Sequence, residues 1–297
     1  MDTVKQVKRI LWLILFLNLG VAIAKIIVGS LAQSASMVAD GIHSVSDGTS
    51  NIVALIGLAV SAKPIDDKHP YGHGKFEVLT SLFIGAMLLV VAGGILKEAY
   101  ERIFNPIMPQ FDTISIVVLL TTLIINIFVC TYEANQGRKL NSYLLTADAM
   151  HTKSDIFVSL GVLASIVAIK LGAPPIIDPI ASAIVGCFII MAAFDIIKST
   201  GAVLADEAAL DHNKVESIAR SFPEVLDVHR IRSRGNEPHI FLDMHIKLDP
   251  LMPLGQAHSL AHDIEDHIKA QISPDINVTM HMEPYRGKKS VKNTNIK

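Results

Sequence analysis

Long apolar segments alternate with short polar loops over the first 205 residues of the chain. Six of these segments contain the roughly 20 predominantly apolar residues that a helix needs to cross a bilayer. They are approximately Ile10–Leu31, Ser36–Ala62, Phe76–Leu96, Thr113–Tyr132, Leu144–Leu171 and Pro179–Leu204. The pattern predicts an all-α transmembrane domain of six helices over residues 1–205.

The pattern changes after Leu204, where short amphipathic segments replace the long apolar ones. Apolar residues alternate with polar ones from His239 to Leu248, which is typical of a strand with one buried face. The chain order predicts two helices, Asp211–Phe222 and Gln256–Gln271, and three strands, Val225–Arg234, His239–Leu248 and Asn277–Glu283. An αββαβ order of this size predicts a small α+β, ferredoxin-like domain over residues 206–287. The basic, polar residues 288–297 are expected to be disordered.

Composition agrees with a membrane protein and excludes other classes. The chain is 51% hydrophobic and 18% charged, and its mean hydropathy is +0.44. A formal net charge of −2 gives no basic surface for nucleic acid. Cys130 and Cys187 both lie in apolar segments, which argues against a disulfide framework and against a cysteine-rich metal site.

The distribution of basic residues in the short loops predicts the orientation of the spans. Lys and Arg concentrate on the cytoplasmic side of membrane proteins. The N-terminus and the second–third and fourth–fifth loops carry eight basic residues, and the opposite side carries three. Both termini are therefore expected in the cytoplasm. The segment Leu11–Leu31 is too long for the apolar core of a signal peptide, so it is expected to be a retained first span.

The second and fifth predicted spans contain the same motif, A-D-x-x-H-x-x-S-D, at Ala39–Asp47 and at Ala147–Asp155. The His and the last Asp of each copy are four residues apart, so they share one face of a helix. Two imidazoles and two carboxylates make up a tetrahedral set for a divalent metal ion. The four predicted ligands are His43, Asp47, His151 and Asp155.

The position of this motif inside the membrane indicates a function. An ionised Asp at bilayer depth costs roughly 2.5–3.5 kcal/mol on insertion scales, so a bound cation or proton is needed. Because the ligands must be deprotonated to bind a metal, metal release favours proton uptake. Asp40 and Asp148 precede each His by three residues, and either a supporting contact to the imidazole or a place in an access path fits them. Asn18 and Asn126 are interpreted as partners in hydrogen bonds between helices.

The loop between the second and third spans reads PIDDKHPYGHGK from Pro64 to Lys75. Asp66, His69 and His73 are candidate ligands of a second, weaker metal site. From the residues alone, a metal site and a chance gathering of polar side chains fit this loop equally.

Eight of the twelve histidines lie in the C-terminal domain. His245 alternates away from the buried positions of its predicted strand, as do His281 and Glu283 on theirs. His258 and His262 lie four residues apart on the polar side of a predicted helix. A solvated role suits each of these histidines alone, but the set as a whole favours metal binding.

With six spans, the paired HxxxD motifs, the short HxxxHGK loop and the αββαβ domain, the chain resembles the cation diffusion facilitator family. The resemblance extends to about Arg286 and implies that the two HxxxD motifs form a transport site. It also implies a loop site of Asp66, His69 and His73, and a binuclear cytoplasmic site in which Glu283 replaces a more usual Asp. The residues implied for the cytoplasmic site are His229, His245, His258, His281 and Glu283.

The same resemblance implies a homodimer in a membrane that exchanges a cytoplasmic divalent metal for protons by alternating access. Lys75 matches a basic residue that some members use in a charge interlock across the dimer, and Asp206 or Glu207 is the expected partner. A His at the first ligand position is associated in the family with zinc and against cadmium. A neutral nitrogen in place of an anionic oxygen also favours Zn²⁺ over Mn²⁺.

The fourth–fifth loop, Gln136–Asn141, has no histidine-rich insertion, so a bacterial-type exporter in the plasma membrane is expected. Manganese, iron, cobalt and cadmium remain alternative substrates. An intramembrane metalloenzyme is disfavoured because the chain has no HExxH motif and both carboxylates serve as ligands. A membrane-anchored metal sensor is the remaining rival, and under that hypothesis His43→Ala would leave function intact.

Overall fold

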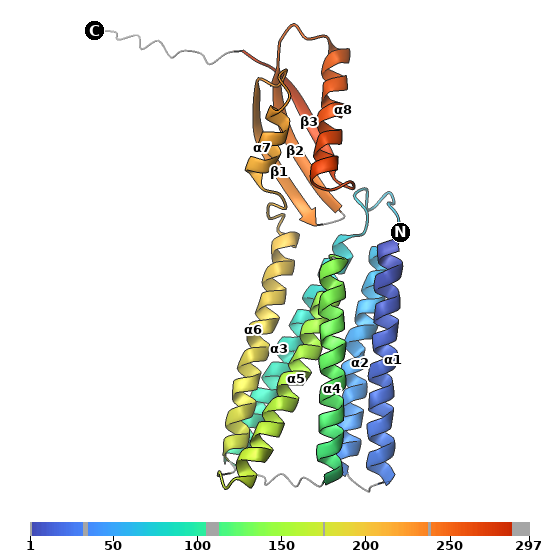
Figure 1. The fold of residues 1–297 in the computed structure, drawn as a ribbon, viewed down its shortest axis with the longest axis vertical. Coiled ribbons are helices and arrows are strands. Elements are labelled where there is room, and N and C mark those ends of the chain that lie inside the picture. The colour runs from blue at the N-terminus through green and yellow to red at the C-terminus, as the bar shows by residue number, and fades with distance from the viewer. Residues whose placement is uncertain (1, 32–34, 105–112, 175, 237–238, 287–297) are drawn as a thin grey trace, which may run out of the picture. The chain divides into compact units, whose positions relative to one another are not determined.

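The computed structural model describes residues 2–31, 35–104, 113–174, 176–236 and 239–286. Contacts between residues divide the chain into two compact units, residues 1–201 and residues 202–297. The first unit is made of long helices and the second contains a small sheet (Figure 1). The predicted tail, residues 288–297, lies outside the described residues.

Six helices follow one another from the N-terminus. They are α1 (Asp2–Leu31), α2 (Ala35–Ser61), α3 (Lys75–Phe104), α4 (Thr113–Lys139), α5 (Tyr143–Lys170) and α6 (Ile177–Leu204). Among the described residues, five of these helices are long and apolar enough to cross a membrane, and α2 contributes a shorter apolar helix, Gly48–Ser61. The predicted helical membrane domain is therefore confirmed.

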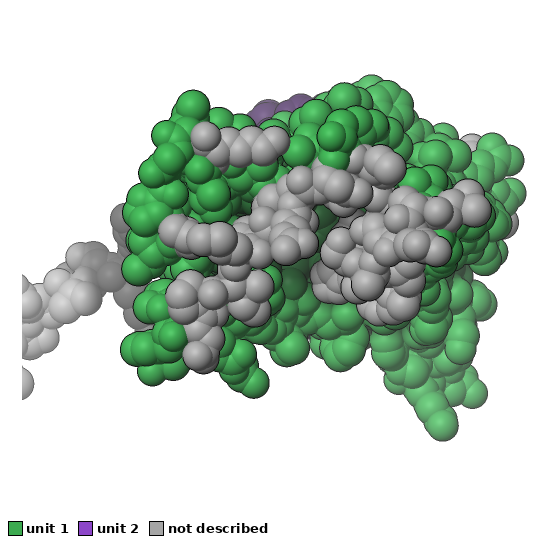
Figure 2. Space-filling view, turned by 90° about the horizontal axis from the view of Figure 1, so that it is seen from below, with its two compact units in different colours: residues 1–201 green, residues 202–297 purple. Residues whose placement is uncertain are grey.

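Neighbouring helices run in opposite directions, with α1 beside α2 and α4 beside α5 (Figure 1). We call the end at which α1 begins the inner end, and it also carries the α2–α3 and α4–α5 connections. The opposite, outer end is where α5 ends and α6 begins. Figure 2 shows the first unit from its outer end, with the described residues in green.

Several helices extend beyond their predicted apolar segments. Helix α3 continues from Leu96 to Phe104 and α4 continues from Tyr132 to Lys139. The added turns contain Glu, Lys, Arg and Ala, which are good helix formers. Because the backbone hydrogen bonds of a helix are internal, a helix continues past the hydrocarbon region while its sequence still favours it.

The core of the first unit is apolar, and so is much of its surface. Leu11, Leu88 and Leu144 are fully buried between helices. Phe128 is 67% exposed and Val90 is 77% exposed. Large apolar side chains on the outside of a helical bundle fit a surrounding lipid phase, because lipid tails are themselves apolar.

The start of α5 is fixed by a cap that reaches another helix. Ser142 is the N-cap residue, and its Oγ accepts a hydrogen bond from the backbone N–H of Leu145. The same hydroxyl donates to Glu77 Oε1 of α3 over 2.6 Å. This contact ties the beginning of α5, the helix that carries the second motif, to the beginning of α3.

The second unit contains α7 (His212–Arg220), β1 (Asp227–Asn236), β2 (His239–Leu248), α8 (Leu254–Gln271) and β3 (Asn277–Pro284). This confirms the predicted αββαβ order. Strand β2 lies in the centre of a three-stranded sheet, antiparallel to β1 and parallel to β3. Its residues are buried alternately, and Leu242, Met244 and Ile246 pack against α7 and α8. The sheet is mixed, and a ferredoxin-like classification stays a prediction.

Candidate metal sites

His151 and Asp155 lie one turn apart on α5, inside the first unit. His151 is 7% exposed, and neither of its ring nitrogens has a hydrogen-bond partner among the described residues. A buried imidazole without a partner is unusual, because buried polar groups are nearly always hydrogen-bonded. Asp155 is partly buried. This part of α5 therefore presents an imidazole without a partner among the described residues, and a carboxyl group one turn away, to the interior.

The other half of the predicted transport site is on α2. Residues 40, 43 and 47 are helical, but the side chains of Asp40, His43 and Asp47 lie outside the described residues. The two helices do meet, because Ser50 and Asn51 of α2 contact Asp148 of α5. The meeting of the four ligands stays a prediction.

His151 and Asp155 open onto a cavity of about 510 Å³ within the helical bundle. Its polar lining also includes Lys25, whose Nζ donates a hydrogen bond to Ser44 Oγ over 2.9 Å. Lys25 is 9% exposed. The cavity brings an amine, carboxyl groups and an imidazole together inside the membrane domain.

Asp148, predicted as a support for His151, is only 1% exposed but bonds elsewhere. Its carboxylate accepts hydrogen bonds from Ser50 Oγ over 3.4 Å and from the side-chain amide of Asn51. Asn51 in turn accepts one from Asn18 Nδ2 over 3.0 Å, which confirms the predicted interhelical role of Asn18. The sequence pattern did not single out Asn51, because a single amide in an apolar span carries no spacing signal.

The loop between α2 and α3 brings its three candidate ligands together. His69 Nδ1 lies 3.0 Å from Asp66 Oδ1, and His73 Nε2 lies 3.4 Å from Asp66 Oδ2. One ligand atom from each of the three residues lies within 4.8 Å of the others. Desolvation raises the pKa of Asp66, but hydrogen bonds from the backbone and ring of His69 outweigh it and lower the pKa below its ordinary value. An ionised carboxylate beside two imidazoles can hold a divalent metal.

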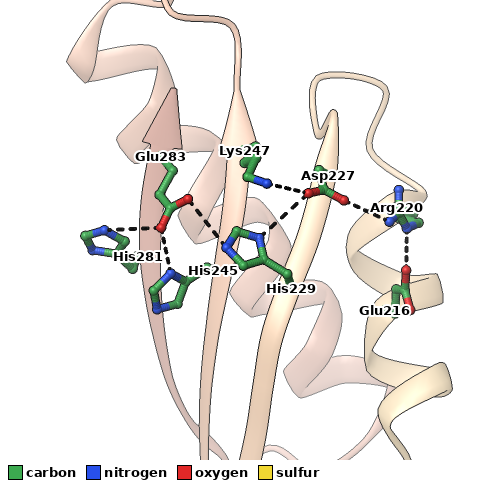
Figure 3. Close-up of polar contacts among 8 residues, drawn as sticks. All are labelled: Glu216, Arg220, Asp227, His229, His245, Lys247, His281 and Glu283. Carbon is green, nitrogen blue, oxygen red and sulfur yellow. Dashed lines mark hydrogen bonds and ion pairs between the residues drawn. The ribbon is translucent and has the colours of Figure 1, made fainter. Parts of the chain in front are cut away.

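The second unit gathers another cluster on the face of the sheet opposite its core (Figure 3). His229 pairs with His245 across β1 and β2, and His245 pairs with His281 across β2 and β3. Glu283 Oε1 lies 2.9 Å from His245 Nδ1, and Glu283 Oε2 lies 3.4 Å from His229 Nε2. His281 Nε2 is more distant, at 3.9 Å from Oε1. The strand register therefore places four of the five implied ligands side by side.

Neighbouring side chains lower the pKa values of the two carboxyl groups at this cluster, Glu283 and Asp227. The hydrogen bond with His245, together with the charges of His229 and His281, outweighs desolvation and lowers the pKa of Glu283. Asp227, which the sequence pattern did not reveal, lies 3.8 Å from His229 Nδ1 through Oδ2. It accepts hydrogen bonds from Lys247 over 2.8 Å and from Arg220 over 3.2 Å, and the first of these is the main reason that its pKa is lowered. Figure 3 shows the continuous chain of polar contacts from Glu283 to α7.

The structure does not bring His258 to this cluster. Helix α8 covers the apolar face of the sheet through Leu260 and Ile264, whereas His245 lies on the other face. His258 is exposed and pairs with His262, with ring centroids 4.5 Å apart. Within one chain, His258 therefore does not join the site, because the sheet separates it from His245.

Asp206, a predicted interlock residue, lies 3.6 Å from Arg234 Nη1 within the second unit. Its backbone has a positive φ of 57° at the end of α6. The interlock with Lys75 would join two chains and stays a prediction.

Comparison with known proteins identifies the class. Residues 11–205 match the model of the cation efflux transmembrane domain, and residues 208–285 match that of the cation efflux protein cytoplasmic domain. The chain belongs to the cation diffusion facilitator family. Members of this family move divalent metal cations out of the cytoplasm, and the family is not enzymatic in general.

Similar proteins come from bacteria and plants. The manganese efflux system protein MneP of Bacillus subtilis is 32% identical over 292 residues, which cover 95% of this chain and 97% of that protein. Metal tolerance protein C1 of Arabidopsis thaliana is 32% identical over 90% of this chain and 60% of its own length. The cation-efflux pump FieF of Shewanella oneidensis is 29% identical over 88% of each chain. Of these three relatives, one is named for manganese, and the names of the other two specify no single metal.

Proposed function

We propose that this chain exports a divalent transition metal, with zinc as the first candidate, from the cytoplasm in exchange for protons. The observation that carries this proposal is His151, a buried imidazole with no hydrogen-bond partner among the described residues, on a cavity inside the membrane domain. Asp155 completes the half-site on α5, and the repeated motif supplies His43 and Asp47 on α2.

Exchange follows from the chemistry of these ligands. Imidazole and carboxylate bind metal in their deprotonated forms, so protons and metal compete for the same atoms. Alternating access would present the occupied site to one side of the membrane and the protonated site to the other. The clusters of the loop and of the second unit would bind metal as accessory sites.

Two candidate metals follow from different observations. Two nitrogen and two oxygen ligands in a tetrahedral set suit Zn²⁺. Manganese is the second candidate, because relatives at 32% and 29% identity carry the name of manganese efflux proteins. Iron, cobalt and cadmium belong in the same comparison, since availability and geometry decide selectivity more than raw affinity.

Transport into proteoliposomes tests the proposal. The full chain is reconstituted with a metal indicator and a pH dye inside, and Zn²⁺, Mn²⁺, Fe²⁺, Co²⁺ and Cd²⁺ are supplied in turn. We expect zinc uptake coupled to proton movement, and its loss in His151→Ala, because the site then lacks one ligand. The matched control is His262→Ala, which removes an exposed histidine of α8.

The results of this transport experiment distinguish between the candidate metals and between an exporter and a sensor. Uptake of manganese alone would overturn the zinc assignment and keep the family function. Unchanged uptake in His151→Ala would overturn the assigned transport site. Absence of transport for every metal, with metal binding intact, would favour a membrane-anchored sensor.

We propose that the protein is a homodimer in the plasma membrane, with both termini in the cytoplasm. The excess of basic residues in the loops at the inner end supports this orientation. The binuclear cytoplasmic site and the Lys75–Asp206 interlock are proposed to join the two copies. Crosslinking of the reconstituted protein would test this arrangement directly.

A further inference from the structure

Glu133 is a carboxyl residue that the proposed function leaves unused. It lies on α4 in the first unit and is 0% exposed. A fully buried carboxyl group is costly unless it is paired, so its partners matter. Its Oε1 has no hydrogen-bond partner among the described residues, as is also true of both ring nitrogens of His151.

The partners of Glu133 lie on α5, on either side of His151. Thr152 Oγ1 donates a hydrogen bond to Glu133 Oε2 over 3.0 Å. Thr152 Oγ1 also lies 3.2 Å from the backbone carbonyl oxygen of Asp148, and the carboxyl groups of Asp148 and Glu133 are close enough for their charges to interact. Glu133 therefore joins α4 to α5 directly beside His151.

Asp148 extends this contact to two further helices. It accepts hydrogen bonds from Ser50 and Asn51 of α2, and Asn51 is bonded to Asn18 of α1. We call this set of six residues the polar junction. It consists of Asn18, Ser50, Asn51, Glu133, Asp148 and Thr152, and it joins α1, α2, α4 and α5.

The polar junction lies one helical turn from the predicted ligands on both motif helices. Asp148 precedes His151 by three residues, and Asn51 follows Asp47 by four. Because α2 and α5 run in opposite directions, both steps lead toward the inner end (Figure 1). The cavity extends the other way, along Val158 of α5 and Glu98 of α3, toward the outer end. The junction thus bounds the cavity on its inner side.

We propose that Glu133 is a positioning residue of the transport site. By bonding to Thr152, it fixes α5 against α4, while Asp148 fixes α5 against α2, so that His151 and Asp155 face α2 and the inner side of the cavity stays closed. This inference rests on the proposed transport function and adds a residue on a helix that carries no predicted ligand.

The experiment compares two variants of Glu133 in the full chain in proteoliposomes. Glu133→Gln keeps an oxygen that accepts from Thr152 and removes only the charge beside Asp148, so we expect an unchanged KM for the metal. Glu133→Leu keeps the approximate size but removes the hydrogen bond from Thr152. We expect it to raise KM by about 10-fold or more, as loss of a residue that orients metal ligands commonly does.

Cys130→Ala is the matched control. Cys130 also lies on α4, and its Sγ contacts the carbonyl oxygen of Ala149 on α5 over 3.4 Å. The substitution removes a contact between the same two helices beside Asp148 and leaves the polar junction intact, so KM is expected to be unchanged. An equal effect of Cys130→Ala and Glu133→Leu would show a general packing role and overturn the proposal.

Three further results test the positioning role of Glu133. An unchanged KM in Glu133→Leu would overturn the positioning role, and a Glu133→Gln variant as weak as Glu133→Leu would show that charge rather than hydrogen bonding matters. Should Glu133→Leu fail to fold, Thr152→Val removes one hydrogen bond and is expected to raise KM in the same direction. A transporting wild type with unaffected variants refutes only this inference, whereas a wild type that moves no metal refutes the proposed function as well.

Discussion

At the scale of single residues, the candidate metal ligands depend on neighbouring side chains for their position. His229 illustrates this, because its buried Nδ1 has no hydrogen-bond partner in the described part of the chain and faces Asp227 at 3.8 Å, while Nε2 faces Glu283. A carboxylate behind an imidazole fixes ring orientation and makes the imidazole a better ligand. Asp227 is itself held by Lys247 and Arg220, so its position depends on both β2 and α7.

Asp227→Asn is expected to weaken metal binding at the cluster of the second unit by about 10-fold or more, because the imidazole of His229 loses the carboxylate behind it. Competition with a chelating indicator on the full chain would measure the affinity. Glu265→Gln is the control, since it breaks the 2.8 Å ion pair with Lys269 on α8, away from the cluster. Equal affinities for Asp227→Asn and the wild type would contradict the prediction.

At the scale of elements, the position of α5 is set at its first turn. Ser142 caps the helix and also donates to Glu77 of α3, so a local signal and a contact between helices coincide. Apolar periodicity predicted the helix but not this link, because the partner lies 65 residues earlier in the chain. The same cap fixes the distance along α5 to Asp148 and His151.

Ser142→Ala should lower the stability of the first unit by about 1 kcal/mol, the usual cost of losing an N-cap side chain. The expected result is a lower midpoint of thermal unfolding in detergent. Ser199→Ala serves for comparison, because Ser199 is exposed on α6 and bonds only to the carbonyl of Ile196 in its own helix. A midpoint as high as that of the wild type would argue that Glu77 alone holds the start of α5.

At the scale of the whole molecule, candidate metal ligands occupy two separate compact units. The proposed transport half-site belongs to residues 1–201 and the sheet cluster to residues 202–297. Each unit has its own buried core, so metal binding in one does not require the packing of the other.

Replacing both His245 and His281 with Ala is expected to remove the metal bound by the second unit and to leave the transport site occupied. Metal stoichiometry of the full chain, and of residues 206–287 alone, would measure this. A double variant of two exposed histidines of α8, His262→Ala with His267→Ala, controls for the number of histidines removed. An unchanged stoichiometry in the fragment after loss of His245 and His281 would refute the assignment.

The amino-acid order by itself determined the helical membrane domain, the αββαβ order and the paired motifs, because each depends on the spacing of residue types within one segment. The alternation of polar and apolar residues along the strands was also sufficient to put His245, His281 and Glu283 on one face. Only the tertiary structure decided that His258 lies on the wrong side of the sheet, that Asp227 faces His229, and that Glu133 meets Asp148. These contacts join residues far apart in the chain, and the packing of helices and strands, which periodicity does not encode, brings them together.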